Sequence, residues 1–249
     1  MLPPCEPVAI RDEIQRILDA LSEHVPPPSA LTDPGADDTA LAALAQALND
    51  ALDALAQCLQ APASALRGAS GADLDRLGDH AVDLLARLAE AAFEAGHAEH
   101  ARDLRCMILA LACCVVRGDG EISHLQPVVD AAADLASREG EPARIRVLHQ
   151  MTDDIVRGLE ARLSGAAPDS ARFQLWRGLL INRAIIATRT LEPELMVPAF
   201  DALLEELPAD APAFFREGMR RMDAQQYPPA VREVMRLYHD VRGAGERLH

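Results

Sequence analysis

The chain contains no lysine, so every one of its 24 positive charges is an arginine. This absence excludes a Walker-type phosphate loop and a pyridoxal phosphate site, because both depend on a lysine side chain. Aromatic residues are also scarce, at 3% of the 249 residues. Strands of sandwiches and barrels are rich in aromatic and β-branched side chains, so this scarcity argues against an all-β fold.

Long apolar runs and export features are missing as well. The longest strongly apolar run, residues 106–116, has about half the length that a membrane-spanning helix needs. The first residues show neither the basic nor the apolar region of an export signal. The chain has five cysteines, an odd number, and two of them are adjacent. This pattern is untypical of a secreted disulfide framework. We therefore expect a cytoplasmic protein that does not contact a membrane.

Acidic residues outnumber basic ones, and the net charge is −15. A charge of this sign argues against nucleic acid and anionic membranes as partners. Apolar residues form 49% of the chain, and 46 residues are alanine, which favours close-packed helices. The composition predicts an all-α protein with a sizeable core, in one large domain or two small ones.

Apolar residues recur at helical spacing along most of the chain, and no segment shows the alternation of a strand. About ten helices are predicted, and their short connections make neighbours antiparallel. We expect stacked helical hairpins, as in a right-handed solenoid, or an irregular bundle. The expected helices cover residues 7–24, 37–60, 72–95, 98–116, a fifth that begins after Ser123, and 143–163, 171–190, 192–207, 211–225 and 229–241.

Two local features define the expected boundaries. A proline-rich stretch, residues 25–36, predicts a linker, so that an N-terminal helix and linker (1–36) precede a helical repeat-like domain (37–249). Ser123 and Gln126 have the spacing of a capping box, in which the serine hydroxyl caps the first turn of a helix. Ser123 is therefore the expected N-cap of the fifth helix.

Residues 213–235, AFFREGMRRMDAQQYPPAVREVM, combine large and small side chains at the spacing of two closely crossing helices. The residues concerned are Phe214, Gly218, Tyr227 and Ala230. The segment resembles a tetratricopeptide-type hairpin, and residues 84–104, LLARLAEAAFEAGHAEHARDL, are similar. The resemblance implies a helical scaffold that binds other proteins.

Metal-binding patterns are incomplete. The segment LALACCVVRGDGEISHLQPVV is similar to the TerB-type signature of tellurite-resistance proteins, but Gln126 stands where that family usually has an acidic residue. Glu94 and His97 form one Glu-x-x-His pair, whereas a di-iron carboxylate bundle needs two such pairs. Cys113 and Cys114 diverge by about 100° on a helix, which does not suit a zinc site. We predict no metal, no cofactor and no catalytic residue.

Arg183 falls within the apolar stripe of the predicted seventh helix, near Trp176 and Leu180. A buried guanidinium without a partner costs several kcal/mol, so this side chain needs a carboxylate, helix carbonyls or an anionic ligand. Arg183 is therefore the candidate for a buried ion pair or for a small acidic ligand.

The C-terminal end differs in charge from the rest of the chain. Residues 213–249 hold seven arginines and five acidic residues, a net +2, which leaves −17 for the first 212 residues. Arg216, Arg220 and Arg221 lie within a turn and a half of one predicted helix. They form either a solvated face paired with Glu217 or a docking site for an acidic partner.

The preferred interpretation is a non-catalytic adaptor or accessory factor that binds another protein through Arg216, Arg220 and Arg221. Two alternatives stay open. One is a helical bundle, possibly an enzyme, that holds a small acidic ligand near Arg183. The other is a structural subunit that forms a homo-oligomer through its leucine-rich second and third helices.

Overall fold

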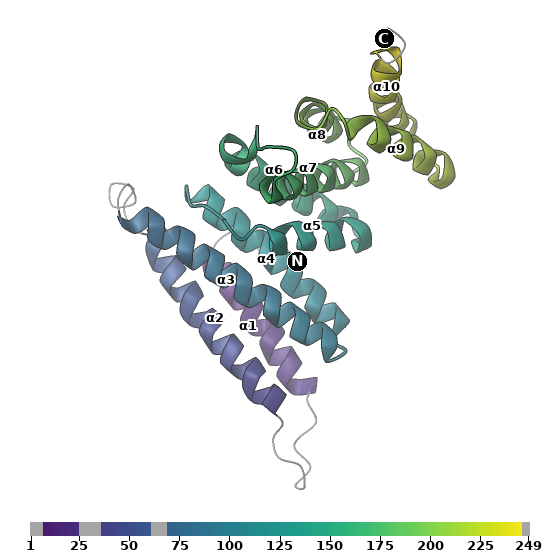
Figure 1. Cartoon of the computed structure of the whole chain (residues 1–249). Coiled ribbons are helices and arrows are strands. Elements are labelled where there is room, and N and C mark those ends of the chain that lie inside the picture. The colour runs from purple at the N-terminus through teal and green to yellow at the C-terminus, as the bar shows by residue number, and fades with distance from the viewer. Residues whose placement is uncertain (1–6, 25–35, 61–68, 246–249) are drawn as a thin grey trace. The chain divides into compact units, whose positions relative to one another are not determined.

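The computed structural model describes residues 7–24, 36–60 and 69–245, and within these ranges it has ten helices and no strand (Figure 1). The all-α prediction is confirmed. The helices are α1 (Pro7–His24), α2 (Ala36–Gln60), α3 (Ala69–Glu94), α4 (Ala98–Arg117), α5 (Gln126–Arg138), α6 (Pro142–Leu163), α7 (Ala171–Arg189), α8 (Pro193–Glu206), α9 (Ala211–Gln225) and α10 (Pro229–Gly245). Most of the predicted proline-rich linker and Cys5 lie outside the described residues.

The chain divides into two compact units. Unit 1 consists of Met1–Leu135 and Arg157–Leu159, and unit 2 of Ala136–Val156 and Glu160–His249. The sequence instead suggested a division after residue 36. In the structure α1 packs against α2 and α4 within unit 1.

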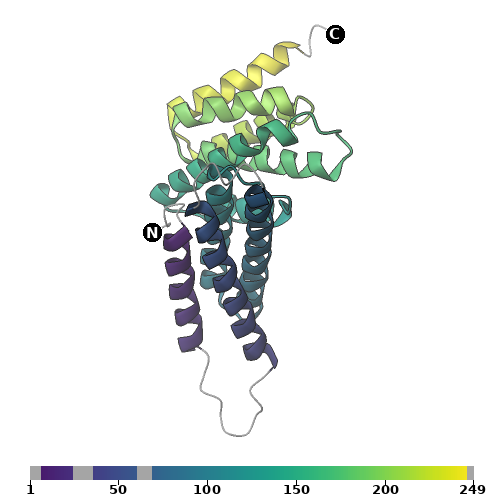
Figure 2. The ribbon, with the colours of Figure 1, turned by 90° about the vertical axis from the view of Figure 1, so that its left-hand side faces the viewer.

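In unit 1, α3 packs along both α2 and α4, and Figure 2 shows α1 and α2 side by side. The apolar stripe predicted for α1 is buried, with Ile10, Ile14 and Ile17 at 0–1% exposure. Residues 106–115 of α4 are all buried, including Cys106, Cys113 and Cys114. This apolar half of α4 lies at the centre of the core, as expected for a segment without a polar face.

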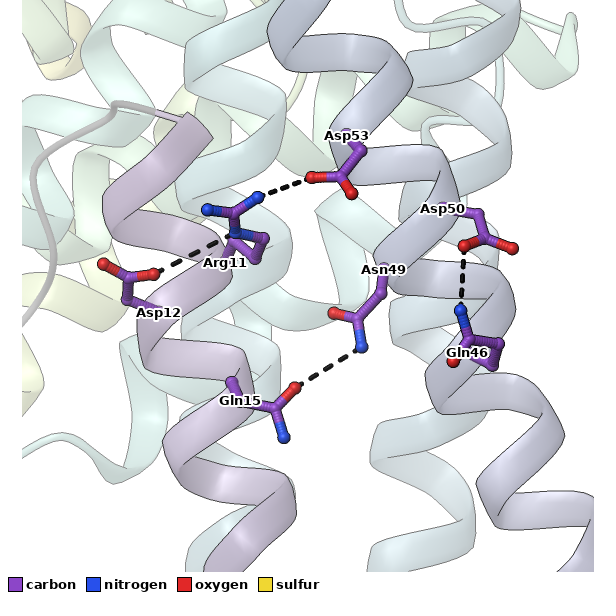
Figure 3. Close-up of polar contacts among 7 residues, drawn as sticks. All are labelled: Arg11, Asp12, Gln15, Gln46, Asn49, Asp50 and Asp53. Atoms are coloured by element: carbon purple, nitrogen blue, oxygen red, sulfur yellow. Dashed lines mark hydrogen bonds and ion pairs between the residues drawn. The ribbon is translucent and has the colours of Figure 1, made fainter.

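Polar contacts cross the surface between α1 and α2 (Figure 3). Arg11 Nη1 lies 2.5 Å from Asp53 Oδ1, and Asn49 donates a 3.4 Å hydrogen bond to Gln15. Arg11 and Asp53 are both about half exposed, so their ion pair contributes at most about 1 kcal/mol. The isoleucines and leucines beneath this edge provide most of the packing.

The connection between α4 and α5 is held by aspartates of α3. Asp79 accepts hydrogen bonds from the backbone N–H groups of Ser123 and His124, at 2.8 and 3.0 Å. α5 begins only at Gln126, whose side chain donates to Asp130. The prediction that Ser123 is the N-cap in a capping box is therefore wrong, because Asp79 fixes the backbone of Ser123 outside the helix.

Unit 2 is built around contacts of α7 with α8, of α9 with α10, and of α10 with α8. Its aromatic side chains meet edge to face: the rings of Phe200 and Phe215 have centroids 5.1 Å apart, and those of Phe200 and Tyr238 are 5.2 Å apart. Such pairs add about 0.5–1.5 kcal/mol each beyond the burial of their area. They fix α8, α9 and α10 against one another.

Candidate functional site

Three arginines of α7 each bind a different part of unit 2. Arg177, Arg183 and Arg189 are spaced six residues apart, which places successive side chains about 240° apart around the helix. They therefore point in three directions about 120° from one another. Through these side chains α7 forms charged hydrogen bonds with three different neighbouring segments.

Arg183 pairs with Asp153 of α6. The guanidinium Nε donates a 2.9 Å hydrogen bond to Asp153 Oδ1, and Nη2 donates to the same oxygen. Side-chain exposure is 6% for Arg183 and 13% for Asp153. The buried guanidinium thus has a carboxylate partner, which was one of the two arrangements expected for Arg183.

Arg177 and Arg189 attach the two ends of α7. Arg177 donates bonds of 2.9 and 2.6 Å to both carboxylate oxygens of Asp210, the residue that precedes α9, and the bond raises the pKa of Arg177. Arg189 donates to the backbone oxygens of Ala136 and Glu139. Carbonyls at the end of a helix lack partners within it and attract a cation.

His149 of α6 lies beside the Arg183–Asp153 pair. The residue is 6% exposed, and its buried Nε2 has no hydrogen-bond partner in the described part of the chain. Burial is the main cause that lowers the pKa of His149, and Arg183 lowers it further, while Asp153 and Glu192 act in the opposite direction. The ring is therefore neutral near pH 7.

The sequence analysis did not identify Asp153, His149 or Glu192. Arg146, His149 and Asp153 are three and four residues apart, so they share one face of α6. Glu192 precedes α8 and accepts a 2.8 Å hydrogen bond from Arg146 Nε. The helical spacing of Arg146, His149 and Asp153 is the signal that could have grouped these residues on one face.

The second candidate site is the exposed arginine face of α9, formed by Arg216, Arg220 and Arg221. Arg220 and Arg221 are 72% and 65% exposed, and both pair with Glu217, at 2.7 and 2.8 Å. These hydrogen bonds lower the pKa of Glu217 to about 2. Arg216 is exposed and has no partner among the described residues. Glu217 therefore pairs with two of the three arginines, and the face keeps an excess of positive charge.

The arginine face lies on a firmly packed helix. Phe215 and Met222 are buried on the opposite side of α9, at 0% and 1% exposure. A Cβ at Gly218 would lie 2.6 Å from the sulfur of Met235 in α10, so this glycine permits the close approach of the two helices. α9 therefore presents its arginines from a fixed position.

The two candidate sites are separate. Arg183 is buried in α7, whereas Arg216, Arg220 and Arg221 lie on the surface of α9.

The histidines considered for a metal site contact each other through their rings: the centroids of His97 and His100 are 5.9 Å apart. Across residues 7–24, 36–60 and 69–245, no three His, Cys, Asp or Glu side chains cluster as metal ligands would. No helix in these ranges has the length and apolar character that crossing a membrane requires.

No protein-family model matches the chain, and no curated protein or solved structure matches it either. The resemblances to tetratricopeptide-type hairpins and to the TerB-type signature therefore stay predictions. The structure shows that α9 packs against α10, and this contact by itself identifies no family.

Proposed function

We propose that the protein is a non-catalytic adaptor or accessory factor that binds an acidic segment of another protein on the arginine face of α9. The observation that carries the proposal is the charge imbalance at this face, where three exposed arginines lie near one carboxylate that pairs with only two of them. Arginine suits such a role because its planar fork binds a carboxylate with two hydrogen bonds.

Rigidity of the face supports the proposal. Phe215 and Met222 anchor α9 from behind, and Gly218 brings it close to α10. A partner that binds here gains contacts without ordering the helix first, which reduces the entropic cost of association. Glu217 also holds Arg220 and Arg221 in place before a partner arrives.

Charge distribution supports the same conclusion. The C-terminal 37 residues carry a net +2, whereas the remainder of the chain carries −17. An acidic partner is repelled by most of the chain and attracted only by its C-terminal part, so electrostatics direct it to the region that contains α9.

The other two interpretations have less support. The guanidinium of Arg183 already binds Asp153, so a small acidic ligand would have to displace a buried carboxylate. The leucines of α2 and α3 that were considered for oligomerisation are largely buried inside unit 1; they include Leu48, Leu52, Leu55, Leu74, Leu84, Leu85 and Leu88. Among the described residues, the buried pair and these buried leucines therefore offer little surface to a ligand or a second subunit.

The test uses a fluorescently labelled oligoglutamate peptide and fluorescence anisotropy. We expect the wild-type chain to bind it at about 0.05 M salt and to lose most of this affinity at about 0.3 M, because screening shortens the range of exposed charges. The triple variant Arg216→Glu, Arg220→Glu and Arg221→Glu should bind at least about tenfold more weakly.

A matched control changes arginines of the adjacent helix. Arg232 and Arg236 of α10 are exposed but have their own carboxylates, Asp223 and Glu233. The variant Arg232→Glu and Arg236→Glu should retain most of the binding. Equal weakening by both variants would show attraction to general positive charge, and unchanged binding by a folded triple variant would exclude the α9 face.

A further inference from the structure

His149 is a buried titratable side chain that the proposed docking face does not use. On α6 it lies one turn after Arg146 and one turn before Asp153. Both neighbours join α6 to other elements: Asp153 binds Arg183 of α7, and Arg146 binds Glu192 at the start of α8. His149 Nε2 has no partner in the described residues although it is buried.

We propose that His149 is a proton-sensitive latch, and that protonation of its ring releases α6 from α7 and α8 at mildly acidic pH. The neutral imidazole is tolerated here because an uncharged ring costs far less to bury than a charged one. An imidazolium is not, since a buried charge needs acceptors that compensate for the water it loses.

The surroundings of His149 offer one nearby carboxylate on each side, and both are engaged. Asp153 on α6 is bound by Arg183 of α7, so a protonated His149 and Arg183 would compete for one carboxylate. Glu192, which precedes α8, is bound by Arg146. The backbone of Leu195 in α8 also faces the ring as a hydrogen-bond acceptor. Protonation therefore places two cations beside one aspartate.

The direction of the pH effect follows from linkage. In the unfolded chain His149 binds a proton near its ordinary pKa of 6.5, whereas burial keeps the folded ring neutral to lower pH. Below pH 6.5 the unfolded state then holds more protons than the folded state, so the stability of unit 2 falls. One such group raises the unfolding equilibrium constant by up to about tenfold for each pH unit.

Unit 2 contains its own reporter for the experiment. Trp176 in α7 is the single tryptophan of the chain and is 1% exposed. Urea unfolding followed by its fluorescence at pH 6.5 and 5.5 should show a rise of up to about fivefold in the unfolding constant of the wild-type chain, because half of the unfolded chains already carry the proton at pH 6.5. The variant His149→Gln should lose this rise.

A matched control is His239→Gln in α10, which changes an exposed histidine of the same unit. This variant should respond to pH as the wild type does. A rise that persists in His149→Gln, or that is absent from the wild type, would overturn the latch.

A second measurement needs no variant to fold. The ring C–H resonance of His149 in the wild-type chain, followed by NMR, should not show a titration midpoint near pH 6.5. Faster hydrogen exchange of α6 amides should accompany acidification to pH 5.5, after correction for the intrinsic exchange rate. An ordinary titration midpoint with unchanged exchange would also overturn the proposal. Binding of the oligoglutamate peptide to α9 does not enter either result, so the two proposals fail independently.

Discussion

Arg183 and Asp153 form an ion pair across α6 and α7 in which two guanidinium nitrogens bind one carboxylate oxygen. Both side chains are largely removed from solvent. Desolvation and attraction nearly cancel in such a pair, so its presence adds little net stability, while the loss of one partner leaves the other uncompensated.

The first prediction follows from this balance. Asp153→Ala should lower the free energy of unfolding by about 3–5 kcal/mol, because Arg183 then stays buried without its carboxylate. The double variant Asp153→Leu and Arg183→Met should recover most of this loss. Urea unfolding followed by Trp176 fluorescence measures both. A double variant as unstable as Asp153→Ala would show that the pair itself stabilises unit 2.

The sequence predicted the helices well for a physical reason. Apolar residues at helical spacing end at prolines, glycines and short polar runs, and these interruptions coincide with the observed ends, as in α1 at residues 7–24 and α9 at residues 211–225. Each signal lies within a few residues of the end it marks. The content and order of the helices therefore follow from local properties of the chain.

Interactions between distant residues were not predictable in the same way. Ser123 was expected to cap α5, but Asp79, 44 residues earlier, binds its backbone instead. The need of Arg183 for a partner was evident, yet nothing in its own helix identified Asp153, which is 30 residues away. Such pairings depend on how the helices pack against one another, and the periodicity of a single helix does not predict this packing.

The second prediction concerns the connection between α4 and α5. A Cβ at Gly120 would lie 2.8 Å from side-chain atoms of both Leu74 and Val115. Gly120→Ala should therefore destabilise the chain by about 1–3 kcal/mol through overpacking. Thermal unfolding followed by circular dichroism measures the effect. Gly140→Ala is the matched control, because a Cβ there meets nothing within 4 Å, and its melting temperature should change little.

The third prediction concerns Tyr238 of α10, whose hydroxyl donates a 2.6 Å hydrogen bond to Asp201 of α8. Burial and this carboxylate raise the pKa of Tyr238 well above its ordinary value of 10.0. The phenol therefore stabilises the fold fully below pH 10, and this contribution declines as the pH rises towards the raised pKa. Absorbance at the tyrosinate band, compared between wild type and Tyr238→Phe, should assign to Tyr238 a component that ionises only above pH 10. If the component assigned to Tyr238 ionised with the ordinary tyrosine pKa of 10.0, that result would contradict the hydrogen bond.

The last prediction tests the geometry of the arginine face itself. Hydrogen bonds from Arg220 and, as the smaller contribution, from Arg221 lower the pKa of Glu217 from 4.5 to about 2. A carboxyl group with a lowered pKa favours the folded state above pH 4.5, and that contribution disappears as the pH falls towards 2. NMR titration of the Glu217 side chain should therefore give a midpoint near 2 in the wild type. In Arg220→Gln combined with Arg221→Gln the midpoint should move up towards 4.5, whereas Arg232→Gln in α10 should leave it unchanged. A wild-type midpoint already near 4.5 would mean that Glu217 does not hold Arg220 and Arg221. The face would then present three mobile arginine side chains instead of a fixed arrangement.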